Sequence, residues 1–415
     1  MTRQADTPAD ALRERQSLFS PGERTDRPAR SASAYAHLDQ SPFDYHAHTR
    51  ELLDEWYARL PKHAQPSIRK RFTSARRDQH LGAFFELYMH ELIGRGGFDA
   101  VEIDVGREDP DHIVPDLLAH RGAEAFPVEA TVCLGDDVVD PRARPRLNQF
   151  YDAVEGSERG REYIVYVDVR DIGPDTLRHR TVTKFLDQWL GELDPDEELA
   201  RADRGEPAPG ATFERFGWKV HFTASGVQPE LRDCELGVIG GVSEGLGGYT
   251  HRIVGANTIE FDGPRPLRDE ELLTRSLRDK AGHGYDAGDR PLMIAVMCAG
   301  GFVEDRDIAQ ALLGPLHHQI GGGDHYEPGG LWREGAGWRN TRVAAVLTFA
   351  QLSPISVAAV EPTLWLNPAA THPLPPDLYP WRTMAIQPDG RTVEHPATRT
   401  VADVLSISPG FPRCR

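Results

Sequence analysis

The stretch "PDLLAHRGAEAFPVEATV", residues 115–132, decides the fold. Apolar residues on both sides of Arg121–Gly122 predict two neighbouring strands joined by a turn at these two residues. An acid, Asp116, follows the proline that precedes the first strand. A second acid, Glu129, lies on the second strand, with Thr131 two residues further on. Acids placed in this way on adjacent strands can point to the same face of a sheet.

These residues are of the types that hold a hard divalent cation. Such a cation prefers carboxylate, carbonyl and water oxygens in octahedral geometry. Asp116 and Glu129 supply carboxylates, and the backbone carbonyl of Ala130 can be a third ligand. Glu86 lies in the middle of a predicted helix, in "AFFELYMHELI", and can bind a second ion or orient a water. The pattern therefore predicts a site for Mg²⁺ or Mn²⁺, which can activate water against a phosphodiester.

The rest of the chain mixes helical and strand patterns. Amphipathic spacing predicts helices, and apolar or alternating runs predict strands. The predicted helices include 45–61, 181–194 and 269–282, and the predicted strands include 99–106, 162–170, 218–224, 291–300 and 343–352. Helices and strands that alternate along a chain indicate an α/β fold with a mixed sheet flanked by helices.

The order of these features resembles the PD-(D/E)XK nuclease superfamily. A helix carrying Glu86, then a hairpin with "PD" and "VEAT", covers the pattern over residues 75–170, and later segments resemble the rest of a bacterial family on that fold. The resemblance implies a restriction-endonuclease-like core within residues 45–385. The expected parts are a disordered tail over 1–44, a core over 75–175 and 269–367, a large insertion over 176–268, and a C-terminal tail over 386–415.

Thr131 departs from the superfamily pattern, which has a lysine at this position. The lysine contacts the attacking water and the scissile phosphate, whereas a threonine hydroxyl carries no positive charge. Some members of the superfamily place the charge on a neighbouring helix. Lys280, in the helix before the apolar strand "PLMIAV", is the first candidate here, and Lys184 is the second. The expected catalytic set is therefore Glu86, Asp116, Glu129, Thr131 and Lys280.

Composition restricts the classes of function. A formal charge of −17 argues against binding nucleic acid over the whole surface. Residues 62–80 form a local basic segment that can contact nucleic acid or can be an ordinary solvated helix face. No apolar run is long enough to span a bilayer, and the N-terminus lacks the apolar region of a secretory signal. Four scattered cysteines indicate free thiols and a cytoplasmic protein.

Three other features are weaker candidates for a site. The glycine-rich stretch 236–251 lacks the ending of a phosphate-binding loop. Residues 317–327 contain His317, His318, Asp324, His325 and Glu327, which are zinc-ligand types without helical His-x-x-x-His spacing. Trp332 and Trp338 stand beside arginines and can stack on bases, although aromatic residues at loop ends are more often part of a core.

The leading prediction is a cytoplasmic, Mg²⁺-dependent or Mn²⁺-dependent nuclease, with DNA favoured over RNA as its substrate. The first alternative is a catalytically inactive nuclease fold that serves as a module for binding nucleic acid or protein, which Thr131 and the acidic surface favour. The second is an unrelated α/β enzyme that acts on a small molecule at the histidine-rich loop. Convergence of Asp116, Glu129 and Glu86, with an amine in the same pocket, would separate these alternatives.

Overall fold

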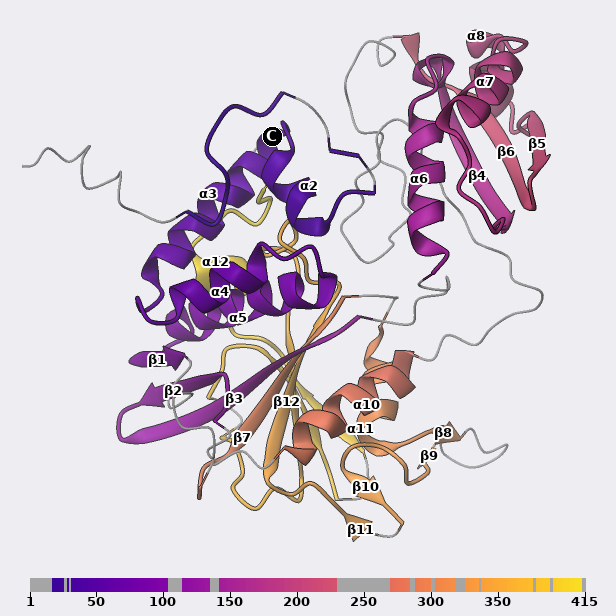
Figure 1. The fold of residues 1–415 in the computed structure, drawn as a ribbon. Helices are drawn as coiled ribbons and strands as arrows, with labels where there is room; N and C mark the ends of the chain where they lie inside the picture. Colours follow the sequence, from indigo (N-terminus) through magenta and orange to yellow (C-terminus); the bar gives the residue numbers. More distant parts are fainter. Residues whose placement is uncertain are drawn as a thin grey trace, which may run out of the picture. The chain divides into compact units, whose positions relative to one another are not determined.

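The described residues form two compact units in the computed structural model (Figure 1). Unit 1 comprises residues 1–27, 33–135 and 268–415, and unit 2 comprises 28–32 and 136–267. The structure describes residues 17–25, 28–29, 31–103, 114–134, 142–229, 269–283, 288–299, 303–317, 325–335, 337–375, 378–388 and 391–412.

An eight-stranded sheet forms the centre of unit 1, in the order β1-β2-β3-β7-β12-β13-β14-β15. Its strands are β1 (Ala100–Ile103), β2 (Leu117–Arg121), β3 (Glu124–Cys133), β7 (Leu292–Cys298), β12 (Val343–Ala350), β13 (Thr363–Leu366), β14 (Arg382–Ile386) and β15 (Thr392–His395). β7 is parallel to both β3 and β12, while β2 and β13 pair antiparallel with their neighbours β3 and β12. The predicted α/β class with a mixed sheet is therefore confirmed.

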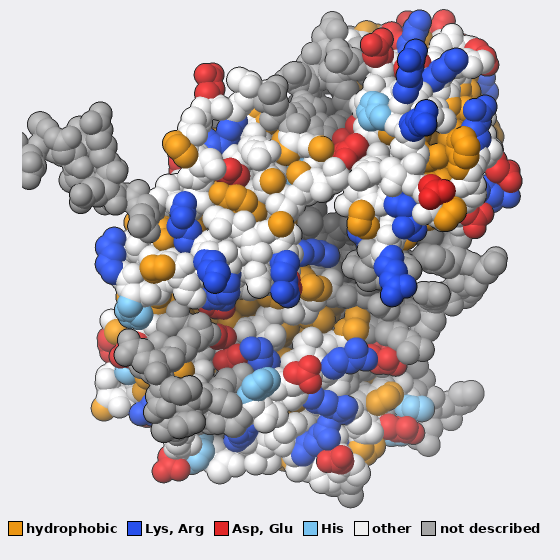
Figure 2. All heavy atoms as spheres, viewed as in Figure 1, with side chains coloured by type: hydrophobic (Ala, Val, Ile, Leu, Met, Phe, Trp, Pro, Cys, Tyr) orange, Lys and Arg blue, Asp and Glu red, His pale blue; other side chains and the backbone are white. Residues whose placement is uncertain are grey.

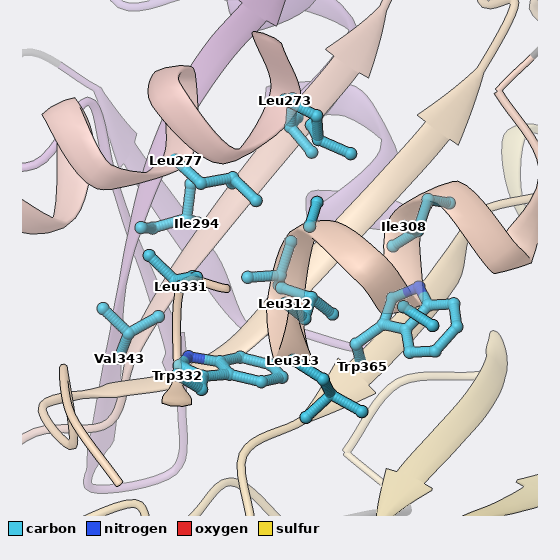
Figure 3. Packing of buried hydrophobic residues seen from close by; sticks show 14 of the residues in the cluster. Leu273, Leu277, Ile294, Ile308, Leu312, Leu313, Leu331, Trp332, Val343 and Trp365 are labelled. Carbon is cyan, nitrogen blue, oxygen red and sulfur yellow. The ribbon is translucent and has the colours of Figure 1, made fainter. Parts of the chain in front are cut away.

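Helices cover both faces of this sheet, and continuous apolar runs in the central strands make that possible. All seven residues of β7 are buried, as expected for a strand covered on both faces. On one face, α10 (Asp269–Gly282) and α11 (Asp305–Leu313) pack against alternate strand residues (Figure 3). On the other face, Phe85 and Tyr88 of α5 (Arg77–Arg95) contact Phe349 of β12 edge to face.

Further short elements complete the described part of unit 1. The helices are α2 (Ala34–Gln40), α3 (Asp44–Arg59), α4 (Gln65–Phe72) and α12 (Val401–Leu405). Two small hairpins are formed by β8 (Leu316–His317) with β9 (His325–Tyr326), and by β10 (Arg333–Glu334) with β11 (Gly337–Trp338). Among the described residues, no helix is both long enough and apolar enough to cross a membrane.

Unit 2 has a core of its own. A three-stranded antiparallel sheet, in the order β4-β6-β5, packs with helices α6 and α7. Its elements are α6 (Arg144–Glu155), the 3-10 helix η1 (Arg159–Glu162), β4 (Tyr163–Asp171), α7 (His179–Leu190), α8 (Pro195–Asp203), β5 (Gly210–Arg215) and β6 (Trp218–Gly226). The sequence predicted that an insertion begins at residue 176. The structure assigns β4 to unit 2 because β4 pairs with β6 and not with the larger sheet.

The ends of the chain also differ from the expected tails. Residues 17–44, predicted to belong to a disordered segment, include helix α2 and the buried side chains of Leu18 and Phe19. The ring of Phe19 packs edge to face on Phe72. The polar average over the first 44 residues concealed this buried apolar pair. At the other end, residues 386–415 contain β15 and α12, whose N-terminus is capped by Thr400.

The core around Trp332 tests this packing. Trp332 is fully buried in the cluster that α10 and α11 form with the sheet (Figure 3). Trp332→Ala is expected to lower the free energy of unfolding by about 3–5 kcal/mol, because it leaves a cavity. Val393→Ala, at a position with 44% exposure, is the control and should change the free energy by less than about 0.5 kcal/mol. Equal effects of the two substitutions in urea denaturation would contradict this core.

Candidate functional site

The β2–β3 hairpin brings Asp116 and Glu129 together. Gly122 occupies the turn with a φ of 62°, and the register pairs Leu117 with Val128. Asp116 therefore stands opposite Glu129, one position beyond the end of β2. The backbone N–H of Asp116 donates to Oε2 of Glu129 at 3.3 Å. Both side chains are buried, with 7% and 2% exposure.

Lys280 reaches the same carboxylate from helix α10. Glu129 pairs in register with Ile294, which belongs to the cluster packed under α10. Residues opposite each other on adjacent strands face the same side of a sheet, so Glu129 points toward α10. Its Oε1 forms an ion pair and hydrogen bond with the Lys280 ammonium. The second candidate, Lys184, lies on α7 of unit 2.

Glu86 approaches from helix α5 and is paired with an arginine. Arg71, near the C-terminus of α4, binds both carboxylate oxygens of Glu86, with Nη2 donating to Oε2 at 2.6 Å. Two parallel N–H···O bonds make this a bidentate pair of the strong, oriented kind. Glu86 is buried at 6% exposure, so Arg71 provides the charge that burial of this carboxylate requires.

Burial and neighbouring charges both act on the carboxyl group of Asp116. Its pKa is raised well above the ordinary value, first by burial and then by the negative charges of Glu86 and Glu129. Lys280 and the N–H of Ala130, which donates to Oδ2 of Asp116 at 3.0 Å, act in the opposite direction. Mutual repulsion among buried carboxylates favours the neutral acid at one of them. A positive ion that entered the site would reverse that preference.

Ala130 and Thr131 complete the predicted set on β3. The N–H and C=O of one strand residue point to the same side. The bond from the Ala130 N–H to Asp116 therefore places the Ala130 carbonyl on the Asp116 side of the strand. Thr131 alternates with Ala130, is half-buried and pairs in register with Val296. The site's ammonium comes from Lys280, and Thr131 contributes a neutral hydroxyl to the same face as Glu129.

Among the described residues, the second half of β3 pairs with another strand on one side only. β2 pairs with β3 only over residues 124–128, and within the described part of the chain residues 129–133 pair only with β7. Figure 2 shows a recessed band between α4–α5 and α10, with Lys and Arg side chains along its margins. β3 packs against both α5 and α10, and Figure 1 shows it passing between them. The two buried carboxylates thus lie where the pairing of β2 with β3 ends.

The donor atoms of this site suit a hard divalent cation. Asp116, Glu129 and the Ala130 carbonyl offer oxygens, which are the ligands that Mg²⁺ and Mn²⁺ prefer. In the described residues, no three His, Cys, Asp or Glu side chains are arranged to hold a metal ion as they stand. As they stand, Glu86 is bound by Arg71 and Glu129 by Lys280. The donor oxygens of Asp116, Glu129 and Ala130 would suit such an ion if Lys280 moved away from Glu129.

Those of the weaker candidates that the structure describes are not part of this site. His317 contacts Glu327 at 3.3 Å, and its ring centroid is 6.1 Å from that of His325. His318, Asp324 and the glycine-rich stretch 236–251 lie outside the described residues. Trp332 is a core residue, and Trp338 packs beside the same core under Arg333, 5.7 Å from its ring centroid. Packing in and beside the core therefore explains the positions of the two tryptophans.

Most arginines of the basic segment 62–80 contact the protein itself. Arg69 donates to the carbonyl of Ser17, and the exposed Arg76 pairs with Asp78. Arg71 binds Glu86, and Arg77 donates to the carbonyl of Ala299. The sequence predicted a basic surface over this segment without assigning Arg71 to the carboxylates. The sequence shows that Arg71 is positively charged. Its pairing with Glu86 depends on how α4 packs against α5.

Comparison of the chain with protein-family models, with curated proteins and with solved structures found no match. The functional argument therefore depends on the geometry of the residues described above.

Asp116→Asn is expected to stabilise the protein at neutral pH in EDTA. The folded pKa of Asp116 lies above the unfolded value of about 3.9. The unfolded chain therefore ionises first as pH rises, and the folded state loses stability above that pH. Asparagine removes this loss, so Tm should rise by about 2–4 °C for each kcal/mol recovered. The gain should vanish near pH 4, and a lower Tm for the variant at pH 7 would contradict it.

Glu91→Gln is the control with the opposite sign. Burial favours a raised pKa at Glu91, but a hydrogen bond with His90 and the charges of Arg59 and Arg95 lower it overall. A carboxyl group whose pKa is lower in the folded than in the unfolded protein stabilises the fold at pH values above its unfolded pKa. That stabilisation is lost as the pH falls through the folded pKa. Thermal denaturation between pH 4 and 8 should therefore show a lower Tm for Glu91→Gln at neutral pH.

Proposed function

We propose that this protein is a metal-dependent endonuclease that hydrolyses phosphodiester bonds of nucleic acid, with DNA favoured over RNA. The observation that carries the proposal is the ion pair of Lys280 with Glu129 beside Asp116 and Glu86. Carboxylates from two adjacent strands, an acid from a helix and a lysine form the set that the PD-(D/E)XK pattern requires. We propose on the same basis that unit 1 contains a restriction-endonuclease-like core. The free thiols of Cys133 and Cys298 support the further proposal that the protein acts in the cytoplasm.

Asp116, Glu129 and the Ala130 carbonyl would hold Mg²⁺ or Mn²⁺, with Glu86 available for a second ion or a water. When bound, such a cation lowers the pKa of a coordinated water and polarises the phosphate. Asp116, whose raised pKa favours the neutral acid in the free protein, would give up its proton to become a ligand. Metal affinity should therefore increase with pH.

Lys280 has two roles in this proposal. In the free protein it neutralises Glu129. With substrate present it would turn from the carboxylate to the scissile phosphate and stabilise the negative charge that develops there. In the reaction, a water oxygen forms a bond to phosphorus and one P–O ester bond breaks. The water's proton passes to solvent, and the leaving oxygen takes up a proton, so atoms and charge balance.

Cleavage by four variants tests this assignment. Lys280→Ala should reduce cleavage of DNA in Mg²⁺ or Mn²⁺ by about 10²–10³-fold, the range for loss of one group that stabilises developing charge. Asp116→Ala should abolish it, and EDTA should do the same for the wild type. Lys184→Ala, the matched control in unit 2, should leave it unchanged. Thr131→Lys in the Lys280→Ala background should restore part of the activity. Full activity in Lys280→Ala would contradict the role of Lys280.

A catalytically inactive fold that binds nucleic acid or protein is the second candidate, and Thr131 is the observation that favours it. The same assay separates the two. If the wild type cleaves neither DNA nor RNA with either metal, while Thr131→Lys alone gains metal-dependent cleavage, the natural protein is a binding module. Cleavage by the wild type that Asp116→Ala removes would exclude that candidate.

A further inference from the structure

Arg77 marks the far end of the open edge of β3. Its Nη2 donates to the carbonyl of Ala299, just after β7, at 3.0 Å. The N–H of Ala299 in turn donates to the carbonyl of Cys133, the last residue of β3, at 2.8 Å. The guanidinium is half-buried and is thereby held beside the carboxyl ends of two parallel strands. It has five N–H donors, so it can serve this carbonyl and a phosphate together.

The carboxylates and Arg77 are separated by a short, defined length of strand. Four residue steps lead from Glu129 to Cys133, a span of about 13 Å at the usual strand rise. Backbone N–H groups two residues apart in a strand point to the same side. The N–H of Val132 therefore points to the side of β3 on which the Ala130 N–H binds Asp116. Arg71 lies at the other end of the span through its contact with Glu86. Cations therefore stand at both ends of a stretch of β3 that pairs only with β7 among the described residues.

From this arrangement we infer that Arg71 and Arg77 bind two backbone phosphates of a nucleic-acid strand that lies along residues 130–133 of β3. The inference rests on the proposed function and names the surface that holds its substrate. Arg71 and Lys280 are paired here with the carboxylates of Glu86 and Glu129, while Arg77 adds a further positive charge. The divalent cation proposed for the carboxylates would add two more, so a polyanion complements the loaded edge. A span of about 13 Å equals the axial length of about four nucleotides of one duplex strand. Two contacts at this separation would fix the strand across the carboxylates.

Binding in EDTA measures these contacts without cleavage. Fluorescence anisotropy of a labelled DNA oligonucleotide, as duplex and as single strand, gives affinity at several salt concentrations. Loss of one phosphate contact should reduce the slope of log affinity against log salt by about 0.9 for duplex or about 0.7 for single strand. We expect this change for Arg77→Ala and for Arg71→Ala. Arg76→Ala is the matched control, because Arg76 is 69% exposed and paired with Asp78, and its slope should equal that of the wild type.

A double variant separates phosphate binding by Arg71 from simple neutralisation of Glu86. Arg71→Ala alone leaves the Glu86 charge without its arginine, which by itself would repel a polyanion. Adding Glu86→Gln removes that charge. If Arg71 binds phosphate, the double variant keeps the reduced salt slope. If Arg71 only neutralises Glu86, the double variant regains the wild-type slope, and the inference is overturned for Arg71.

A second buried ion pair on the same helix controls for stability. Glu91 of α5 is bound by Arg59 of α3 in a similar way, with 4% exposure of its side chain. Arg59→Ala should lower Tm to an extent comparable with Arg71→Ala and leave the DNA salt slope unchanged. Circular dichroism and Tm confirm that each variant is folded before its slope is compared. A reduced slope in Arg59→Ala would mean that the slope reports stability, and would overturn the inference.

Failure of this inference can be distinguished from failure of the proposed function. If the wild type cleaves DNA with Mg²⁺ or Mn²⁺ but Arg77→Ala and Arg71→Ala keep the slope of Arg76→Ala, the protein is a nuclease and these arginines are not its phosphate contacts. If the wild type neither binds nor cleaves DNA or RNA, both the proposed function and the inference are wrong.

Discussion

The two-sided pairing of strand β3 is the constraint on which the site depends. β3 pairs antiparallel with β2 over residues 124–128 and parallel with β7 over 128–133. β2 stops where the chain reaches Asp116, so within the described part of the chain no strand pairs with β3 on that side from Glu129 onward. A continuous partner along β3 would bury its backbone groups and leave no access to the carboxylates. The end of β2 therefore creates both the opening and the position of its first acid.

Burial at this opening sets the electrostatics of the site. The carboxylates of Glu86, Asp116 and Glu129 are each less than 10% exposed. Arg71 of α4 pairs with Glu86, and Lys280 of α10 pairs with Glu129. The pKa of Asp116 is raised by burial and by its acidic neighbours Glu86 and Glu129. Charges held in a buried site interact more strongly than on the surface. In the free protein, Arg71 and Lys280 thus balance the charges of Glu86 and Glu129. A bound divalent cation and a phosphate would change these pairings.

Part of this site could be predicted from the sequence because its chemistry is local. Asp116 and Glu129 are 13 residues apart across one tight turn, and alternation along a strand then determines which residues share a face. Lys280 required a different argument, from the apolar strand that follows its helix, and that argument named the residue that contacts Glu129. Arg71 was not assigned, since its bond to Glu86 depends on the packing of α4 against α5.

The sequence by itself determined the α/β class, the hairpin and the apolar strands, because period and turn chemistry are properties of short segments. The tertiary structure alone decided which strands are neighbours: β4 pairs with β6 in a separate unit, and β7 lies between β3 and β12. It also decided that Leu18 and Phe19 belong to the core and not to a tail. Such contacts join residues far apart in the chain, and their stability comes from burial of apolar surface, which no short window of sequence records.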